Sequence, residues 1–133
     1  MKFLPLGKEL TIAIDVDGTI AHSSHIDFSV VDKCPDELAK AKPIKEALKI
    51  IRRLHKQGHK IVFYTSRSKR SKKATEKWLK KYGFPYHHIE MEKFVAHVYI
   101  DDRAINGCNW KEVAKQLKRK DLPGVIARCA GRI

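Results

Sequence analysis

Two acidic residues, a glycine and a hydroxyl residue come directly after a short apolar segment near the start of the chain. They are Asp15, Asp17, Gly18 and Thr19. An ionised carboxylate resists burial unless a cation or a hydrogen-bond network compensates it, so packing alone does not explain two of them at the end of a strand. This set of groups indicates a phosphoryl-transfer site in which a bound cation compensates the carboxylates.

Polar groups also follow the predicted strands 60–64 and 97–100. A hydroxyl pair with an arginine follows the first and an acidic pair follows the second: Thr65, Ser66, Arg67, Asp101 and Asp102. Taken singly, each group is typical of a turn or a helix cap. Ligands of parallel sheets bind at the carboxyl ends of the strands, so the coincidence predicts that these groups share one site.

The elements that must position these groups alternate between strands and helices. The predicted strands cover residues 11–16, 60–64, 87–90 and 97–100. Helices are predicted from Pro43 to Gly58, over 73–82 with a stop at Gly83, and from Asn109 onward. Alternation of this kind predicts an α/β fold, a three-layer α/β/α sandwich with a mainly parallel sheet and right-handed crossovers.

The chain is short enough for one domain with one core. It has 133 residues, of which 43% are apolar, which is sufficient to build that core. We therefore predict a single domain over 1–133. Residues 20–41 are expected to form a flap and a short insert, and 109–133 a C-terminal helix and tail.

The charge and cysteine content restrict the partners and the compartment. The chain carries 28 Lys plus Arg against 15 Asp plus Glu, a net charge of +13, which favours anionic partners such as phosphorylated metabolites, nucleic acid or an acidic membrane surface. The three cysteines are widely spaced and lack a Cys-x-x-Cys pair, as expected in a reducing compartment. Charges interrupt residues 1–10, and no apolar stretch is long enough to span a bilayer. We therefore expect a cytoplasmic protein without a membrane span.

The motif order over residues 11 to about 106 resembles that of the haloacid dehalogenase (HAD) superfamily of phosphohydrolases. Residues 15–19 are similar to its first motif, Asp-x-Asp-Gly-Thr. Lys93 matches the third motif, although Glu92-Lys93-Phe94 stands where small members often have Gly-Lys-Pro. The resemblance implies a Rossmann-like fold. In the superfamily a cap domain usually follows the first motif or lies between the second and the third. The corresponding stretches here, 20–41 and 68–92, are short, which implies that a large cap domain is absent.

The resemblance also implies a role for each matching residue. Asp15 would be the nucleophile that forms an aspartyl-phosphate, and Asp17 would be the general acid and base. Thr65 and Lys93 would complete the catalytic set. The residues expected to bind substrate are Gly18, Thr19, Ser66 and Arg67. The expected metal ligands for Mg²⁺ are Asp15, Asp17, Asp101 and Asp102, with Asp102 acting through a water.

The implied activity is Mg²⁺-dependent hydrolysis of a phosphate monoester, with a sugar phosphate or a nucleotide as the small phosphorylated substrate. A polynucleotide 3′-phosphatase remains open because residues 67–73 carry five positive charges, which either bind a second anionic group or form a solvated first helical turn. A non-catalytic phosphate-binding module of the same fold is a further alternative, although such relatives usually lack an acid that is present here. A cap-less site can also be closed by a neighbouring subunit, which leaves a homo-oligomer open.

Overall fold

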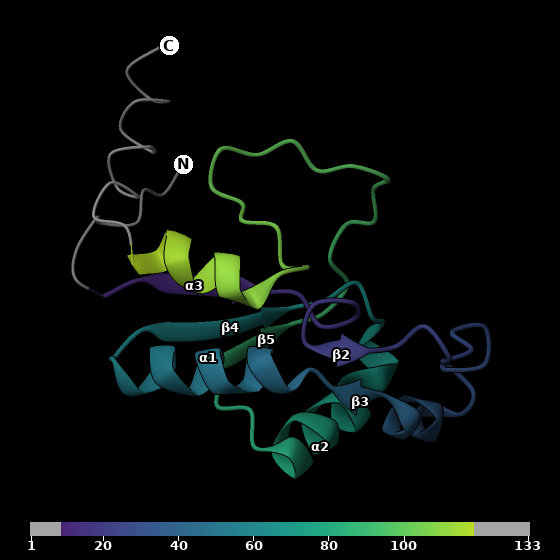
Figure 1. The fold of residues 1–133 in the computed structure, drawn as a ribbon. Coiled ribbons are helices and arrows are strands. Elements are labelled where there is room, and N and C mark those ends of the chain that lie inside the picture. The colour runs from purple at the N-terminus through teal and green to yellow at the C-terminus, as the bar shows by residue number, and fades with distance from the viewer. Residues whose placement is uncertain (1–8, 119–133) are drawn as a thin grey trace.

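The computed structural model describes residues 9–118 and contains a three-stranded parallel sheet. Its strands are β1 (Thr11–Ile14), β4 (Lys60–Tyr64) and β5 (His88–Glu90), in the order β1-β4-β5 (Figure 1). A small antiparallel pair joins β2 (Ala21–His22) to β3 (Lys42–Pro43). The predicted α/β class with a parallel sheet is confirmed.

Within the described residues, three α-helices and two short 3-10 helices connect and cover these strands. They are α1 (Lys45–Lys56), α2 (Lys72–Tyr82), α3 (Trp110–Lys118), η1 (Pro35–Lys40) and η2 (Lys69–Ser71). The helix predicted from Pro43 begins slightly later, because Pro43 pairs in β3. The other two begin close to their predicted positions, and Asn109 caps α3 by accepting a hydrogen bond from the Glu112 N–H at 3.2 Å.

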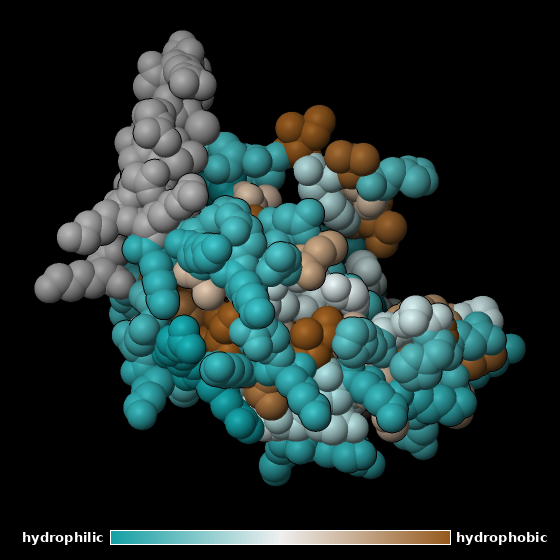
Figure 2. Space-filling model, viewed as in Figure 1, coloured by the Kyte–Doolittle hydropathy of each residue, from teal (hydrophilic) through white to brown (hydrophobic). Residues whose placement is uncertain are grey.

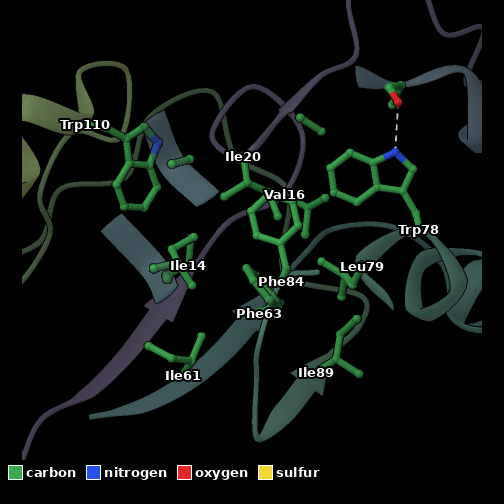
Figure 3. Packing of buried hydrophobic residues seen from close by; sticks show 14 of the residues in the cluster. Ile14, Val16, Ile20, Ile61, Phe63, Trp78, Leu79, Phe84, Ile89 and Trp110 are labelled. Atoms are coloured by element: carbon green, nitrogen blue, oxygen red, sulfur yellow. Dashed lines mark hydrogen bonds between the residues drawn. The ribbon is translucent and has the colours of Figure 1, made fainter. Parts of the chain in front are cut away.

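The apolar core lies on one face of the parallel sheet. Parallel register places Ile14 beside Phe63, and Phe63 beside Ile89, so the three buried side chains share that face. Trp78 and Leu79 of α2 pack against them (Figure 3). Because the site residues follow these strands directly, the core holds the carboxyl ends of β1 and β4 in fixed positions.

The insert over residues 20–41 is packed against the domain. Leu38 of η1 is fully buried, η1 contacts α2, and the indole N–H of Trp78 donates to the Ala41 carbonyl at 2.9 Å (Figure 3). Ile26 and Val31 are also buried. The insert is therefore packed beside α2.

The fourth predicted strand, 97–100, does not form. Residues 91–109 make an irregular segment that leaves the sheet after β5 and returns to α3 (Figure 1). Its large apolar side chains over 94–100 are exposed, with Ile100 at 98% and Val98 at 72%, and Figure 2 shows apolar atoms standing out in this region. Within residues 9–118, β1 therefore has a hydrogen-bonded neighbour on one edge, β4. The prediction was wrong because an apolar run signals burial or pairing only if a partner edge accepts it.

The remaining sequence predictions concern the termini and the membrane. The predicted tail beyond residue 118 lies outside the described residues. Among the helices of residues 9–118, none has both the length and the apolar content needed to cross a membrane.

Candidate active site

A tight turn at the end of β1 presents the first two carboxylates. The backbone N–H groups of Ile20 and Ala21 both donate to the Val16 carbonyl, at 2.9 and 3.1 Å. The Gly18 N–H donates to the Ala21 carbonyl at 2.9 Å, and Gly18 has a φ of 80°. Only glycine adopts this conformation without steric cost, so the turn depends on it. The turn keeps Asp15 and Asp17 together at the carboxyl end of the sheet.

Asp15 is half-buried, and its carboxylate is only weakly hydrogen-bonded by neighbouring side chains. Its Oδ2 accepts a long hydrogen bond from the Thr19 hydroxyl at 3.5 Å. Burial raises the pKa of the Asp15 carboxyl, while the backbone N–H of Val16 and the ammonium of Lys93 act in the opposite direction. A carboxylate held partly out of water and near a lysine is suited to act as a nucleophile or a metal ligand.

Asp17, in contrast, is held by several donors. Arg67 donates from Nε to Asp17 Oδ2 at 2.8 Å and from Nη2 to Oδ1 at 2.6 Å. The hydroxyl of Ser23 also donates to Oδ1, at 2.6 Å. Arg67 Nη1 donates to the Thr75 hydroxyl at 2.9 Å, and the residue is 6% exposed. The sequence-based hypothesis placed Arg67 on the substrate, whereas the structure engages its guanidinium with Asp17 and Thr75.

Thr65 and Lys93 meet at the end of β4. Thr65 is buried, and its hydroxyl accepts a hydrogen bond from the Arg67 N–H at 3.2 Å, which leaves the hydroxyl's own proton to donate. The Lys93 N–H donates to the Thr65 carbonyl at 2.9 Å, so backbone pairing extends past the strands and brings the lysine to the site. The Lys93 ammonium lies 5.1 Å from the ring centroid of Tyr64 and 4.6 Å from that of Tyr99.

The residue before Lys93, Glu92, has an unusual backbone conformation. Glu92 has a φ of 60°, the left-handed conformation that favours glycine. Glycine is the residue expected at this position from the Gly-Lys-Pro pattern of small members. The chain therefore has a backbone conformation that favours glycine at the position where that pattern has glycine.

The predicted metal ligands are only partly assembled. Asp15 and Asp17 share one turn, whereas Asp101 and Asp102 are exposed on segment 91–109, where Asp101 Oδ1 accepts from the Arg103 N–H at 2.7 Å. Over residues 9–118, no group of three or more His, Cys, Asp or Glu side chains is arranged to hold a metal ion. The donor chemistry nevertheless fits Mg²⁺, which prefers oxygen ligands, because Asp15 offers a lightly bonded carboxylate.

Segment 91–109 begins and ends beside the site. It leaves at Lys93, next to Thr65, and returns at Gly107, where an added Cβ would lie 2.7 Å from Thr19 Cγ2. The indole N–H of Trp110 then donates to the Thr19 carbonyl at 2.7 Å. The segment is thus anchored at both ends next to residues predicted to catalyse the reaction or bind substrate. The other predicted substrate-binding residues, Gly18 and Ser66, lie exposed after β1 and β4.

Sequence reasoning missed two residues of this site, Ser23 and Thr75. Thr75 interrupts the apolar stripe of α2 and is fully buried, so a polar residue on a core-facing stripe was an available signal. Ser23 sits in the insert, where nothing in the local pattern distinguishes it from a loop serine. The exposed cations Lys69 and Arg70 follow Thr65 along the chain, and Lys69 lies 3.7 Å from Glu92.

Residues 12–119 match the model of the family described as PITM 1-3, LNS2 domain. A curated relative from Bacillus cereus, named "Putative nucleotidase", is 35% identical over 69 residues. The match takes in 52% of this chain and 35% of that relative, so the chain spans about a third of the relative's length.

Two solved structures share the fold. A crystal structure of a structural-genomics target from Vibrio cholerae has a TM-score of 0.68 and 22% identity, covering 90% of this chain and 98% of that one. A chain of the Pnkp1/Rnl/Hen1 complex has a TM-score of 0.58 and 18% identity, covering 74% and 32%. At these identities the likeness concerns the fold. Together with the family match, it confirms the predicted kinship with HAD-like phosphohydrolases, which are phosphatase-type hydrolases.

Proposed function

The chain belongs to the LNS2 domain family, and from this premise we propose that it hydrolyses phosphate monoesters with Asp15 as the nucleophile. This proposal rests on the contrast between the two carboxylates of the turn after β1. Asp15 has a raised pKa, and among the described residues one side chain donates to it, that of Thr19 at 3.5 Å, whereas Asp17 is held by Arg67 and Ser23. A loosely bonded carboxylate beside a firmly oriented one suits a nucleophile beside a proton-transfer group.

In the proposed reaction, an Asp15 oxygen attacks phosphorus and the bond to the leaving oxygen breaks. Asp17 gives a proton to that leaving oxygen. The product is an aspartyl-phosphate, which a water then attacks at phosphorus while Asp17 takes the water's proton. Inorganic phosphate leaves and the Asp15 carboxylate is restored. Lys93 and the Thr65 hydroxyl stabilise the phosphoryl group as charge develops on its oxygens.

We assign Mg²⁺ as the cofactor. It would be held by the Asp15 carboxylate and the Asp17 backbone carbonyl, because both side-chain oxygens of Asp17 accept from Arg67. When bound, it would neutralise the repulsion between the nucleophilic carboxylate and the phosphate. Asp101 and Asp102 would join these ligands through a shift of segment 91–109 between its fixed ends.

A small monoester, a nucleotide or a sugar phosphate, is the proposed substrate class. The insert packs on α2, which supports an open, cap-less site. The name of the Bacillus cereus relative favours a nucleotide within this class.

The first experiment measures release of p-nitrophenol from its phosphate ester with Mg²⁺, with a chelator, and with Asp15→Asn. The control is Asp36→Asn, which removes an exposed carboxylate in the first turn of η1. We expect turnover that chelator abolishes and that Asp15→Asn lowers by at least about 10³-fold, with Asp36→Asn unchanged. Persistent turnover in Asp15→Asn would contradict the proposal. A folded wild-type protein without turnover would favour the non-catalytic binding module.

A second candidate, a polynucleotide 3′-phosphatase, is favoured by the exposed cations that follow Thr65 along the chain, Lys69, Arg70, Lys72 and Lys73. Several backbone phosphate contacts give a steep fall of kcat/KM with salt, whereas a single phosphate gives a shallow one. The test compares the salt slopes for a mononucleotide and a 3′-phosphorylated oligonucleotide. A steeper slope for the oligonucleotide that Arg70→Gln reduces would support this candidate.

A further inference from the structure

A buried arginine joins four separate parts of the site. Arg67 follows β4, contacts Asp17 on the turn after β1, and contacts Thr75 on α2. Ser23, from the insert, reaches the same carboxylate. We propose that Arg67 is a positioning residue, which orients the Asp17 carboxylate for proton transfer and does not bind the substrate. This assignment rests on the proposed phosphatase function.

Arg67 is kept from the substrate because its side chain is buried and its guanidinium nitrogens are already hydrogen-bonded. Its side chain is 2% exposed, whereas that of Asp17 is 26% exposed. Nε, Nη1 and Nη2 each donate to a side-chain oxygen within 2.9 Å. A guanidinium that is enclosed and bonded on all three nitrogens cannot turn toward a phosphate without breaking its ion pair with Asp17, which leaves the buried guanidinium charge without that partner. The guanidinium of Arg67 therefore pairs with Asp17 and does not contact the substrate.

The two-point contact fixes both the place and the plane of the carboxylate. A bidentate guanidinium matches the geometry of a carboxylate, and a lysine cannot reproduce it. A general acid must come within about 2.6–3.2 Å of the atom that takes its proton. Because Asp17 is one-quarter exposed, its side chain would otherwise sample several rotamers. The two-point contact with Arg67 restricts the Asp17 side chain to one rotamer.

The hydrogen bonds also distinguish the two oxygens of Asp17. Oδ1 accepts from both Arg67 Nη2 and Ser23, which uses both of its lone pairs. Oδ2 accepts from Arg67 Nε alone among these donors and keeps one lone pair. In the proposed reaction, the transferred proton is therefore carried by Oδ2. It leaves that atom when the leaving oxygen departs and returns to it from the attacking water.

The test uses Arg67→Gln and a series of aryl phosphates whose leaving groups rise in basicity from 4-nitrophenolate to phenolate. Phenol release is followed in a single turnover with saturating Mg²⁺. A weakly basic leaving group departs without a proton, whereas phenolate needs one. We expect a loss of about threefold for 4-nitrophenyl phosphate and about 100-fold for phenyl phosphate, with KM unchanged within about twofold. The matched control, Arg53→Gln, removes an exposed arginine of α1 and should leave the series unchanged.

Two further variants guard against a simple folding defect. Ser23→Ala removes one of the three donors to Asp17 and should steepen the series in the same direction by a smaller factor. In an Asp17→Asn background, Arg67→Gln should add less than about threefold, because two residues that act as one unit are not additive.

The outcomes separate the positioning role from the proposed function. Two results would overturn the positioning role alone, provided that turnover depends on Asp15. One is an equal loss of rate across all leaving groups, and the other is a loss that a rise in KM explains. Wild-type protein without Asp15-dependent turnover would overturn the proposed function, and the positioning role with it.

Discussion

The indole N–H of Trp110 donates a hydrogen bond to the backbone carbonyl of Thr19 at 2.7 Å, across 91 positions of the chain. This bond ties the first turn of α3 to the turn that carries Asp15 and Asp17. Trp110 is 5% exposed, so its ring also belongs to the core. The stability of α3 and the geometry of the site are therefore coupled.

Trp110→Phe should destabilise the protein by about 1–2 kcal/mol, because the part-buried bond to Thr19 is lost, and should lower kcat. The control is Trp78→Phe, which loses a comparable bond to the Ala41 carbonyl away from the catalytic turn. Urea unfolding and turnover of an aryl phosphate measure the two effects. Equal losses of kcat in both variants would show that the Thr19 bond has no special role at the site.

Gly18→Ala should destabilise the protein by about 1–2 kcal/mol and lower kcat. An added Cβ meets nothing within 4 Å, so the left-handed φ of 80° alone causes the strain. Gly58→Ala is a matched control, since Gly58 has a φ of 93° and equally open space at the end of α1. Both variants should lose similar stability, and only Gly18→Ala should lose activity. Unchanged turnover in Gly18→Ala would refute a role for this turn in catalysis.

Glu92→Gly should stabilise the protein by about 1 kcal/mol, because glycine adopts the observed φ of 60° without penalty. The ion pair lost with Lys69 is exposed and spans 3.7 Å, so its contribution is small. Glu92→Ala is the control, since it removes the same ion pair and keeps the strain. Thermal unfolding of the two variants decides the matter, and an equal stability for both would contradict the strained turn.

The raised pKa of Asp15 predicts a pH dependence of both stability and activity, measured for stability without divalent cations. Because the folded pKa lies above the unfolded value, the contribution of this group is present below the unfolded pKa and is lost as pH rises through the folded pKa. Asp15→Asn should therefore remove a decline in unfolding free energy that begins near the ordinary value of 3.8 and continues above it. The acidic limb of kcat/KM for the wild type should also lie above that value. An unfolding free energy with the same pH slope in both proteins would contradict this account.

Mg²⁺ binding tests whether segment 91–109 moves. Asp15→Asn should weaken Mg²⁺ binding by at least about tenfold in calorimetry, and Asp101→Asn should weaken it to a similar extent if the segment brings Asp101 to the site. Asp27→Asn removes a carboxylate of the insert, whose partner is Ser29, and is the control. Wild-type affinity in Asp101→Asn would exclude Asp101 as a ligand and keep the segment in the position described here.

Sequence alone determined the parts of this protein that depend on local chemistry. The strands before Asp15 and Thr65, the stop of α2 at Gly83 and the cap of α3 at Asn109 follow from β-branched runs, left-handed glycine and side-chain capping within a few residues. Motif order predicted a place for Lys93 in the site, and the structure puts its backbone beside that of Thr65. These signals are local because the interactions behind them span only a few positions.

Only the tertiary structure decided which polar groups meet. Arg67 and Asp17 are 50 positions apart, and their pairing depends on β1 and β4 being parallel neighbours in one register. Ser23 reaches Asp17 because the insert packs on α2. The apolar run at 97–100 was expected to pair and instead lies exposed, since strand pairing needs an edge that accepts it. Long-range contacts are set by how elements pack, and a sequence pattern records the tendency of each element without its partner.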